Sequence, residues 1–304
     1  MGGSESRAPA WLEDITLDER FVLAVDEVPH AQLAVYDARL VRRGTAALGG
    51  DGAVSIAAVR TKDGAQVYVA NYDSGSVSVV DLLPDGALGA AHVIRFTRSG
   101  TGPVSARQDK SYAHQVMPAP DGRHVYVCDL GADRIHILRV GAHAADAKHV
   151  DSVAVRDGSG PRHIAFDGDM AYVVMELSLE VQAYVRDASG MLVPQGLPVA
   201  ACAGPGARTL AEIVVAPQRV YVSSRGDPVE DHIGVFCRAP SGALSHLQWH
   251  PSGGRVPRHF SASADGRYLA VANQGSETLA ILDAERLAVL AQHRVGPINY
   301  AGFH

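Results

Sequence analysis

The chain has 304 residues, of which 47% are hydrophobic and 20% charged, so it can bury a large core and is not a disordered protein. Its net charge of −6 argues against a nucleic-acid-binding protein. No apolar run is long enough to span a membrane, and the first residues lack a hydrophobic signal segment. The three widely spaced cysteines favour a reduced, cytoplasmic setting.

Six segments of the chain share one pattern, an apolar alternating strand that ends in a polar pair. In chain order they are FVLAVDE (21–27), QVYVANY (66–72), HVYVCDL (124–130), AYVVMEL (171–177), RVYVSSRG (219–226) and YLAVANQ (268–274). The second residues of these pairs, at positions 27, 72, 130, 176, 225 and 274, are 45, 58, 46, 49 and 49 residues apart. The regular spacing indicates an internal structural repeat.

Each repeat contains more than one strand. The second, third, fourth, fifth and sixth segments are followed by a turn and another alternating strand, and Asp-Gly hairpin turns precede several of them, as at 63–64, 121–122, 167–168 and 265–266. Three or four strands every 45–50 residues are typical of a β-propeller. The amphipathic helices of a TIM barrel are missing, and a jelly roll would not repeat so regularly. We therefore predict an all-β propeller that forms a single domain over 1–304, with 1–10 as a flexible N-terminus.

Two places depart from the repeat. A polar, glycine-rich and basic insertion at 96–111 lengthens the second interval, and we expect it to lie over one face and partly cover a pocket. At the ends of the chain, Trp11 already belongs to the first strand, and 294–304 resembles the first strand of a seventh repeat that is not completed.

The fourth repeat carries charged residues at its strand ends. Arg162 opens one strand in a Pro-Arg-His sequence, and Glu176 ends the next. A guanidinium and a carboxylate behind short turns suggest a rim where a small anion could be bound. The alternative is a structural salt bridge between adjacent strands.

Five strings carry a family resemblance, namely VANYDSGSVSV, RQDKSYAHQVMPAPDGRHVYVCDLGADRIHIL, GSGPRHIAFDGDMAYVVMELSLEVQAY, AEIVVAPQRVYVSSRGD and PRHFSASADGRYLAVANQGSETLAIL. From Trp11 to the C-terminus the chain resembles the seven-bladed propeller lactonases, which include propeller-type 6-phosphogluconolactonases and fungal carboxymuconate-lactonizing enzymes. The resemblance implies seven blades, with the N-terminal strands of one blade missing here. A second histidine that the family often carries is replaced by Tyr112.

The resemblance implies four catalytic residues from neighbouring blades, His114, Arg162, Glu176 and Arg225. Glu176 or His114 could serve as the general base that activates water. The two arginines could bind a phosphate or carboxylate and hold developing negative charge. Taken singly, His114 could be a hydrogen-bonded strand histidine and Arg225 a turn arginine.

Further polar residues near the strand ends are predicted to bind substrate. They are Asn71, Tyr72, Arg107, Glu212, Arg258, His259 and Asn273. Among them, Arg107 belongs to the insertion and Arg258-His259 to a second Pro-Arg-His sequence.

No phosphate loop, nucleophile elbow or zinc-binding pattern is present, so we predict a site without metal, cofactor or covalent serine intermediate. The sequence therefore predicts a cytoplasmic, monomeric lactone hydrolase that resembles 6-phosphogluconolactonase and opens an anionic sugar lactone. Its partner would be that small molecule, and neither nucleic acid nor membrane. The alternatives are a carboxymuconate cycloisomerase, which forms a lactone, and a non-catalytic propeller scaffold.

Overall fold

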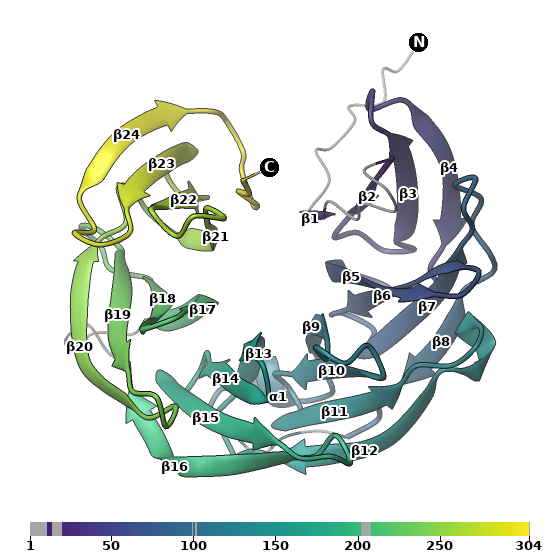
Figure 1. The fold of residues 1–304 in the computed structure, drawn as a ribbon, viewed down its shortest axis with the longest axis horizontal. Helices are drawn as coiled ribbons and strands as arrows, with labels where there is room; N and C mark the ends of the chain where they lie inside the picture. Colours follow the sequence, from purple (N-terminus) through teal and green to yellow (C-terminus); the bar gives the residue numbers. More distant parts are fainter. Residues whose placement is uncertain (1–10, 14–19, 99, 101, 202–207, 304) are drawn as a thin grey trace.

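Six antiparallel sheets of four strands each make up the described part of the chain in a computed structural model (Figure 1). The structure describes residues 11–13, 20–98, 100, 102–201 and 208–303, so the predicted flexibility of 1–10 lies outside the described residues. The sheets follow one another along the chain and are arranged around a common centre (Figure 1). This confirms the predicted β-propeller architecture.

The first three sheets contain the following strands. The first sheet has β1 (Trp11–Glu13), β2 (Phe21–Val25), β3 (Gln32–Asp37) and β4 (Arg42–Ala47). The second has β5 (Ala53–Thr61), β6 (Gly64–Asn71), β7 (Ser76–Leu82) and β8 (His92–Arg95). The third has β9 (Ala113–Pro118), β10 (His124–Asp129), β11 (Arg134–Arg139) and β12 (Lys148–Ala154).

The last three sheets repeat this order. The fourth has β13 (Pro161–Asp167), β14 (Met170–Met175), β15 (Glu180–Arg186) and β16 (Leu192–Ala200). The fifth has β17 (Thr209–Ala216), β18 (Arg219–Arg225), β19 (His232–Arg238) and β20 (Leu244–Pro251). The sixth has β21 (Pro257–Ala262), β22 (Tyr268–Asn273), β23 (Thr278–Asp283) and β24 (Val289–Arg294).

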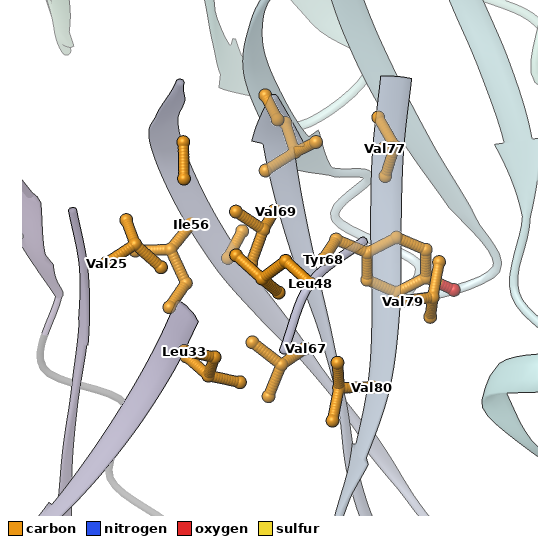
Figure 2. Packing of buried hydrophobic residues seen from close by; sticks show 14 of the residues in the cluster. Val25, Leu33, Leu48, Ile56, Val67, Tyr68, Val69, Val77, Val79 and Val80 are labelled. Carbon is orange, nitrogen blue, oxygen red and sulfur yellow. The ribbon is translucent and has the colours of Figure 1, made fainter. Parts of the chain in front are cut away.

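Apolar side chains fill the space between neighbouring sheets. Figure 2 shows Val25 and Leu33 of the first sheet packed against Ile56, Val67 and Val69 of the second. These strands alternate β-branched residues on both faces, which suits a strand covered on each side by another sheet. Because each sheet packs mainly on its sequence neighbours, the innermost strands are held edge to edge around the centre.

The second sheet also buries polar groups with partners. The hydroxyl of Tyr68, labelled in Figure 2, donates to Gln66 Oε1 at 2.9 Å, and Gln66 Nε2 donates to Gly141 O at 3.0 Å. This chain of hydrogen bonds ties the second sheet to the loop after β11, and it removes the cost of burying the amide and the phenol.

The insertion leaves the sheets after β8. It contains the short helix α1 (Ser105–Gln108), and a 3-10 turn, η1 (Ala144–Asp146), lies between β11 and β12. Ser111 Oγ donates to Arg98 O at 2.8 Å, which holds the two ends of the insertion together. No helix in the described ranges is long and apolar enough to cross a membrane.

The last described segment differs from its prediction. Residues 295–303 form no strand, and the predicted first strand of a seventh repeat is wrong for them. Instead, Tyr300 stacks on His259 with 4.2 Å between ring centroids, and the N–H of Ala301 donates to His259 Nδ1 at 3.3 Å. The segment therefore contacts β21 through side chains rather than through a strand ladder, and Figure 1 shows it turning inward towards the centre.

Candidate active site

Bulges at the start of the innermost strands aim side chains at the centre of the ring. The pairing register skips one residue at Val54, His114, Arg162 and Arg258, and a similar shift occurs between Leu210 and Ile213. A bulged residue leaves the ladder and its side chain is redirected, so bulges are frequent beside functional sites. Here Val54, His114 and Arg258 all line one pocket.

The second strands of the sheets supply the other pocket residues. Glu27, Tyr72 and Glu176 follow β2, β6 and β14, and Arg225 ends β18. These are equivalent positions of the sequence repeat, and antiparallel pairing places them at the same edge as the starts of the innermost strands. The repeat thus places the same position of four of the six sheets around a shared pocket.

The pocket has a volume of about 290 Å³ and is strongly basic. It is lined by Glu27, Val54, Tyr72, Arg107, His114, Glu176, Arg225 and Arg258. Three of these are arginines, and the buried Arg162 lies behind Glu176, so four guanidinium groups face the carboxylates of Glu27 and Glu176. Four positive and two negative charges leave two positive charges, and the pocket therefore favours an anionic ligand.

Glu176 is the centre of the arginine cluster. Its Oε1 lies 3.1 Å from Nη2 of both Arg107 and Arg225, and its Oε2 lies 3.1 Å from Nε of Arg162. Burial alone would raise the pKa of this carboxyl, but the charges of Arg225, Arg162 and Arg107 outweigh burial and lower it. Glu176 is therefore an ionised acceptor that holds three guanidinium groups in place.

Arg162 is fully buried and contacts the site through Glu176. Its Nη1 donates to Ala211 O, and its Nη2 has no hydrogen-bond partner among the described residues. Burial and the charge of Arg225 lower the pKa of Arg162 to about 9, which still leaves it charged at neutral pH. Arg162 therefore holds the Glu176 carboxylate from the buried side of the pocket wall.

His114 is buried and neutral at the pocket wall. Burial, followed by the charge of Arg162, lowers its pKa well below the usual range. Its Nδ1 has no hydrogen-bond partner among the described residues, and its ring packs edge-on against Tyr72 with 5.6 Å between centroids. A neutral imidazole with an uncommitted nitrogen can accept a proton.

The insertion brings Arg107 to the pocket wall. Arg107 Nε donates to the Tyr72 hydroxyl at 2.8 Å, and its Nη2 donates to Glu176 Oε1 at 3.1 Å. Because α1 is joined to two sheets through this one side chain, the insertion covers part of the pocket.

Glu212 and His259 lie in a second cavity of about 250 Å³, lined also by His163 and Tyr300, rather than in the pocket with Glu176. His163 Nδ1 lies 2.8 Å from Glu212 Oε1, and His259 Nε2 lies 3.7 Å from Glu212 Oε2. Burial would raise the pKa of Glu212, but His163 and His259 lower it to about 2.

Asn71 and Asn273 are buried inside their own sheets. Asn71 Nδ2 donates to the hydroxyls of Ser76 and Ser78, at 3.2 and 2.8 Å. Asn273 Nδ2 donates to Ser252 O at 3.1 Å, and the Ser252 hydroxyl donates to its Oδ1 at 3.0 Å. Neither side chain lines the pocket. The Asn71 amide holds the hairpin between β6 and β7, and the Asn273 amide joins β22 to the segment that follows β20.

The sequence profile of the family described as "Lactonase, 7-bladed beta-propeller" matches residues 3–288. The chain belongs to this lactonase family. Among curated relatives, a 6-phosphogluconolactonase of Formosa agariphila is 32% identical over 228 residues, which cover 72% of this chain and 64% of the relative. A 6-phosphogluconolactonase of Bacillus subtilis is 29% identical over 72% of this chain and 63% of its own length. The chain thus spans less than two thirds of these relatives.

Solved structures of similar proteins share the propeller. A candidate 6-phosphogluconolactonase of Bacteroides fragilis superposes with a TM-score of 0.86 at 27% identity, covering 98% of this chain and 88% of its own. The periplasmic gluconolactonase of Pseudomonas aeruginosa gives 0.81 at 27% identity, covering 93% and 85%. The six described sheets are thus the greater part of a seven-bladed lactonase fold.

Two residues that line the pocket with Glu176 were not among the sequence candidates, Glu27 and Val54. The signal for Glu27 was available, because it occupies the repeat position shared by Tyr72, Glu176 and Arg225. Val54 has no polar group, and only the bulge places it in the pocket. In the described part of this lactonase-family chain, no group of three or more His, Cys, Asp or Glu residues is suited to hold a metal ion.

The buried histidines of this propeller should make it sensitive to acid. Burial lowers the pKa of His114, His163 and His259 in the folded state, that of His163 to about 4, whereas an unfolded histidine titrates near 6.5. The unfolded chain therefore binds more protons below about pH 6.5, and stability falls as the pH drops from there towards 4. Between pH 7 and 5 the free energy of unfolding should fall by about 2 kcal/mol for His163 alone.

Urea unfolding at pH 7 and pH 5 measures this loss. In His163→Gln the fall should be smaller than in the wild type by roughly the same 2 kcal/mol. Equal falls in the two proteins would show that His163 titrates alike in the folded and the unfolded chain, and would contradict the lowered pKa of the buried ring.

Proposed function

We propose that this chain hydrolyses a lactone that carries an anionic group, with His114 as the general base. The proposal rests on one observation, the excess of guanidinium groups around a neutral, buried imidazole in the same pocket. His114 is a better candidate for the base than Glu176. Three arginines stabilise the ionised form of Glu176 and so lower the basicity of its carboxylate.

The reaction needs a single water molecule. Water adds to the lactone carbonyl and gives a proton to His114, while arginines of the pocket stabilise the negative charge that forms on the carbonyl oxygen. The bond between the carbonyl carbon and the ring oxygen then breaks, and the imidazolium returns its proton to the departing oxygen. The products are a carboxylic acid and a hydroxyl, and the acid then releases its proton to solvent and becomes a carboxylate, so atoms and charge balance.

The bound substrate would assist the base. A negative charge near His114 raises the pKa of the imidazole, which moves the base closer to the pH at which proton transfer is efficient. The names of the similar proteins support a sugar lactone such as 6-phosphogluconolactone as the substrate. The proposal also includes the catalytic roles of His114, Arg162, Glu176 and Arg225, a monomeric protein and a cytoplasmic location.

Arg258 is the arginine best suited to test recognition of the substrate's charge. It lines the pocket without touching Glu176, and its Nη2 donates to Glu27 Oε2 at 3.3 Å. Arg258→Met should raise KM for 6-phosphogluconolactone by roughly 10- to 100-fold, because a hydrogen bond to a charged group is worth about 1.5–3 kcal/mol. KM for the uncharged glucono-δ-lactone should change by less than about threefold.

Initial rates with both lactones, corrected for spontaneous opening, provide the measurement. No acceleration by the wild type with either lactone would refute the proposed function. Equal losses with the charged and uncharged lactones would refute the role of Arg258 in recognising the anion, and would leave hydrolysis itself intact.

A further inference from the structure

A second basic pocket lies between the outer strands of the second and third sheets. It has a volume of about 290 Å³ and is lined by Arg95, Phe96, Thr97, Arg98, Arg134, His136, His149 and Ser152. Strand register places it on the same side of the ring as the active-site pocket, since Arg134 pairs with Asp129, which in turn pairs with Ala113 beside His114. None of its residues lines the active-site pocket.

Among the described residues, three guanidinium groups of this pocket have no carboxylate partner. Arg95 Nη2 donates to the carbonyl of Gly49 at 3.2 Å, and Arg134 Nη1 donates to that of Asp133 at 2.8 Å. Within the described residues, no carboxylate oxygen lies within 4.0 Å of a nitrogen of Arg95, Arg98 or Arg134. In a chain with a net charge of −6, three uncompensated cations around one cavity form a local site for an anion.

Two acids beside Arg134, namely Asp129 and Asp133, have carboxylates that accept hydrogen bonds from other groups. Asp129 Oδ2 accepts from His136 Nε2 at 3.1 Å, and its Oδ1 accepts from the backbone N–H of Tyr112 at 2.8 Å. Asp133 Oδ1 accepts from Gly160 N at 2.8 Å, and its Oδ2 from Gly158 N at 2.8 Å. Both carboxylates are thus committed to organising turns.

The inner wall of the pocket is rigid. Phe96 is buried and stacks on His136, with 3.9 Å between centroids and 6° between the planes, and His149 packs edge-on against both rings. Ser152 Oγ lies 2.9 Å from His136 Nδ1 and 2.8 Å from His149 Nε2. A wall that is already held in place by these contacts reduces the ordering cost of binding.

The link from Asp129 through His136 to Ser152 has the connectivity of a hydrolytic triad. However, the backbone N–H of Ser152 donates to Asp151 Oδ1 at 2.8 Å and cannot stabilise an oxyanion. The Ser152 hydroxyl is also hydrogen-bonded to His149 Nε2. The cluster is therefore better suited to binding than to attack.

We propose that this pocket binds a phosphate monoester of a small polar molecule. An arginine can bind a phosphate through two parallel hydrogen bonds. Three arginines suit a ligand with two negative charges, such as a phosphate monoester, better than a ligand with one carboxylate. The cavity holds about ten water volumes at roughly 30 Å³ each, which leaves room for a phosphate and an attached group. This inference does not depend on the proposed hydrolysis.

Glycerol 3-phosphate is a suitable probe, with inorganic phosphate and glycerol for comparison. In the wild type, glycerol 3-phosphate should shift the ring resonances of His136 and His149 in a saturable titration, and glycerol should not. The double variant Arg98→Ala, Arg134→Ala should weaken this binding at least tenfold. The control Arg139→Ala changes the opposite end of β11 and should bind as the wild type does.

Lactone hydrolysis provides the second readout, because the active-site pocket also attracts anions. The double variant should keep kcat and KM for 6-phosphogluconolactone within about twofold of the wild type, since neither arginine lines that pocket. The proposal is overturned if the His136 and His149 resonances do not move, or if the double variant and Arg139→Ala bind glycerol 3-phosphate equally. A shift with inorganic phosphate that is as tight as with the monoester would overturn the assigned ligand class.

Discussion

His114→Gln is expected to lower kcat for lactone hydrolysis by roughly 100- to 10,000-fold, the usual contribution of general-base catalysis. KM should change little, because the arginines that attract the substrate remain. Stability should also change little, since Nδ1 of His114 has no hydrogen-bond partner to lose among the described residues. The measurement is the initial rate at saturating lactone, with spontaneous opening subtracted.

The pH profile separates His114 from Glu176 as the base. In the wild type, kcat/KM should stay constant from pH 8 to below 6.5 and fall only at more acidic pH, because burial lowers the pKa of His114. This acidic limb should vanish in His114→Gln. If it persists there and disappears in Glu176→Gln, the assignment of the base is wrong.

Glu176→Gln should cost about 3–5 kcal/mol of unfolding free energy, the usual result of breaking a buried ion pair by removing one partner. The carboxylate is 1% exposed and lies 3.1 Å from Arg107, Arg162 and Arg225. Without its charge, the guanidinium groups of Arg107, Arg162 and Arg225 repel one another with no carboxylate between them. Urea unfolding at pH 7 measures the effect.

Glu27→Gln is the matched control. Its carboxylate is 42% exposed and contacts Arg258 at 3.3 Å in the same pocket. Removing it should cost less than about 1 kcal/mol, as expected for a pair open to solvent. Comparable losses in the two variants would mean that the cluster around Glu176 is as hydrated as the rim.

The repeat in the sequence predicted the propeller, and four of its repeat positions line the pocket, although Glu27 was not among the predicted site residues. Positions 27, 72, 176 and 225 follow the second strand of their sheets, and all four line the pocket. The same rule fails at Leu130, which is buried, and at Gln274, whose amide donates to Asn299 Oδ1. The repeat determines the backbone position of each side chain, and the length and polarity of the side chain determine whether it reaches the pocket.

Neighbouring residues at the bulges could not be sorted by sequence. Arg258 and His259 are adjacent, yet one lines the pocket with Glu176 and the other lines the cavity with Glu212. A strand sends consecutive side chains in different directions, and a bulge resets which one faces the centre. The cavity that Glu212 lines therefore depends on the register shift between Leu210 and Ile213, and no residue type in the sequence predicts that shift.

The contact between Glu27 and Arg258 joins residues 231 positions apart, in the first and the sixth sheet. The same guanidinium lines the pocket in which we propose that the substrate's anionic group binds. Glu27 and the ligand would then compete for one cation, so tight binding of the ligand would loosen the link between the two sheets. Added salt screens both attractions, and occupancy of the pocket and the separation of these sheets would respond together to ionic strength.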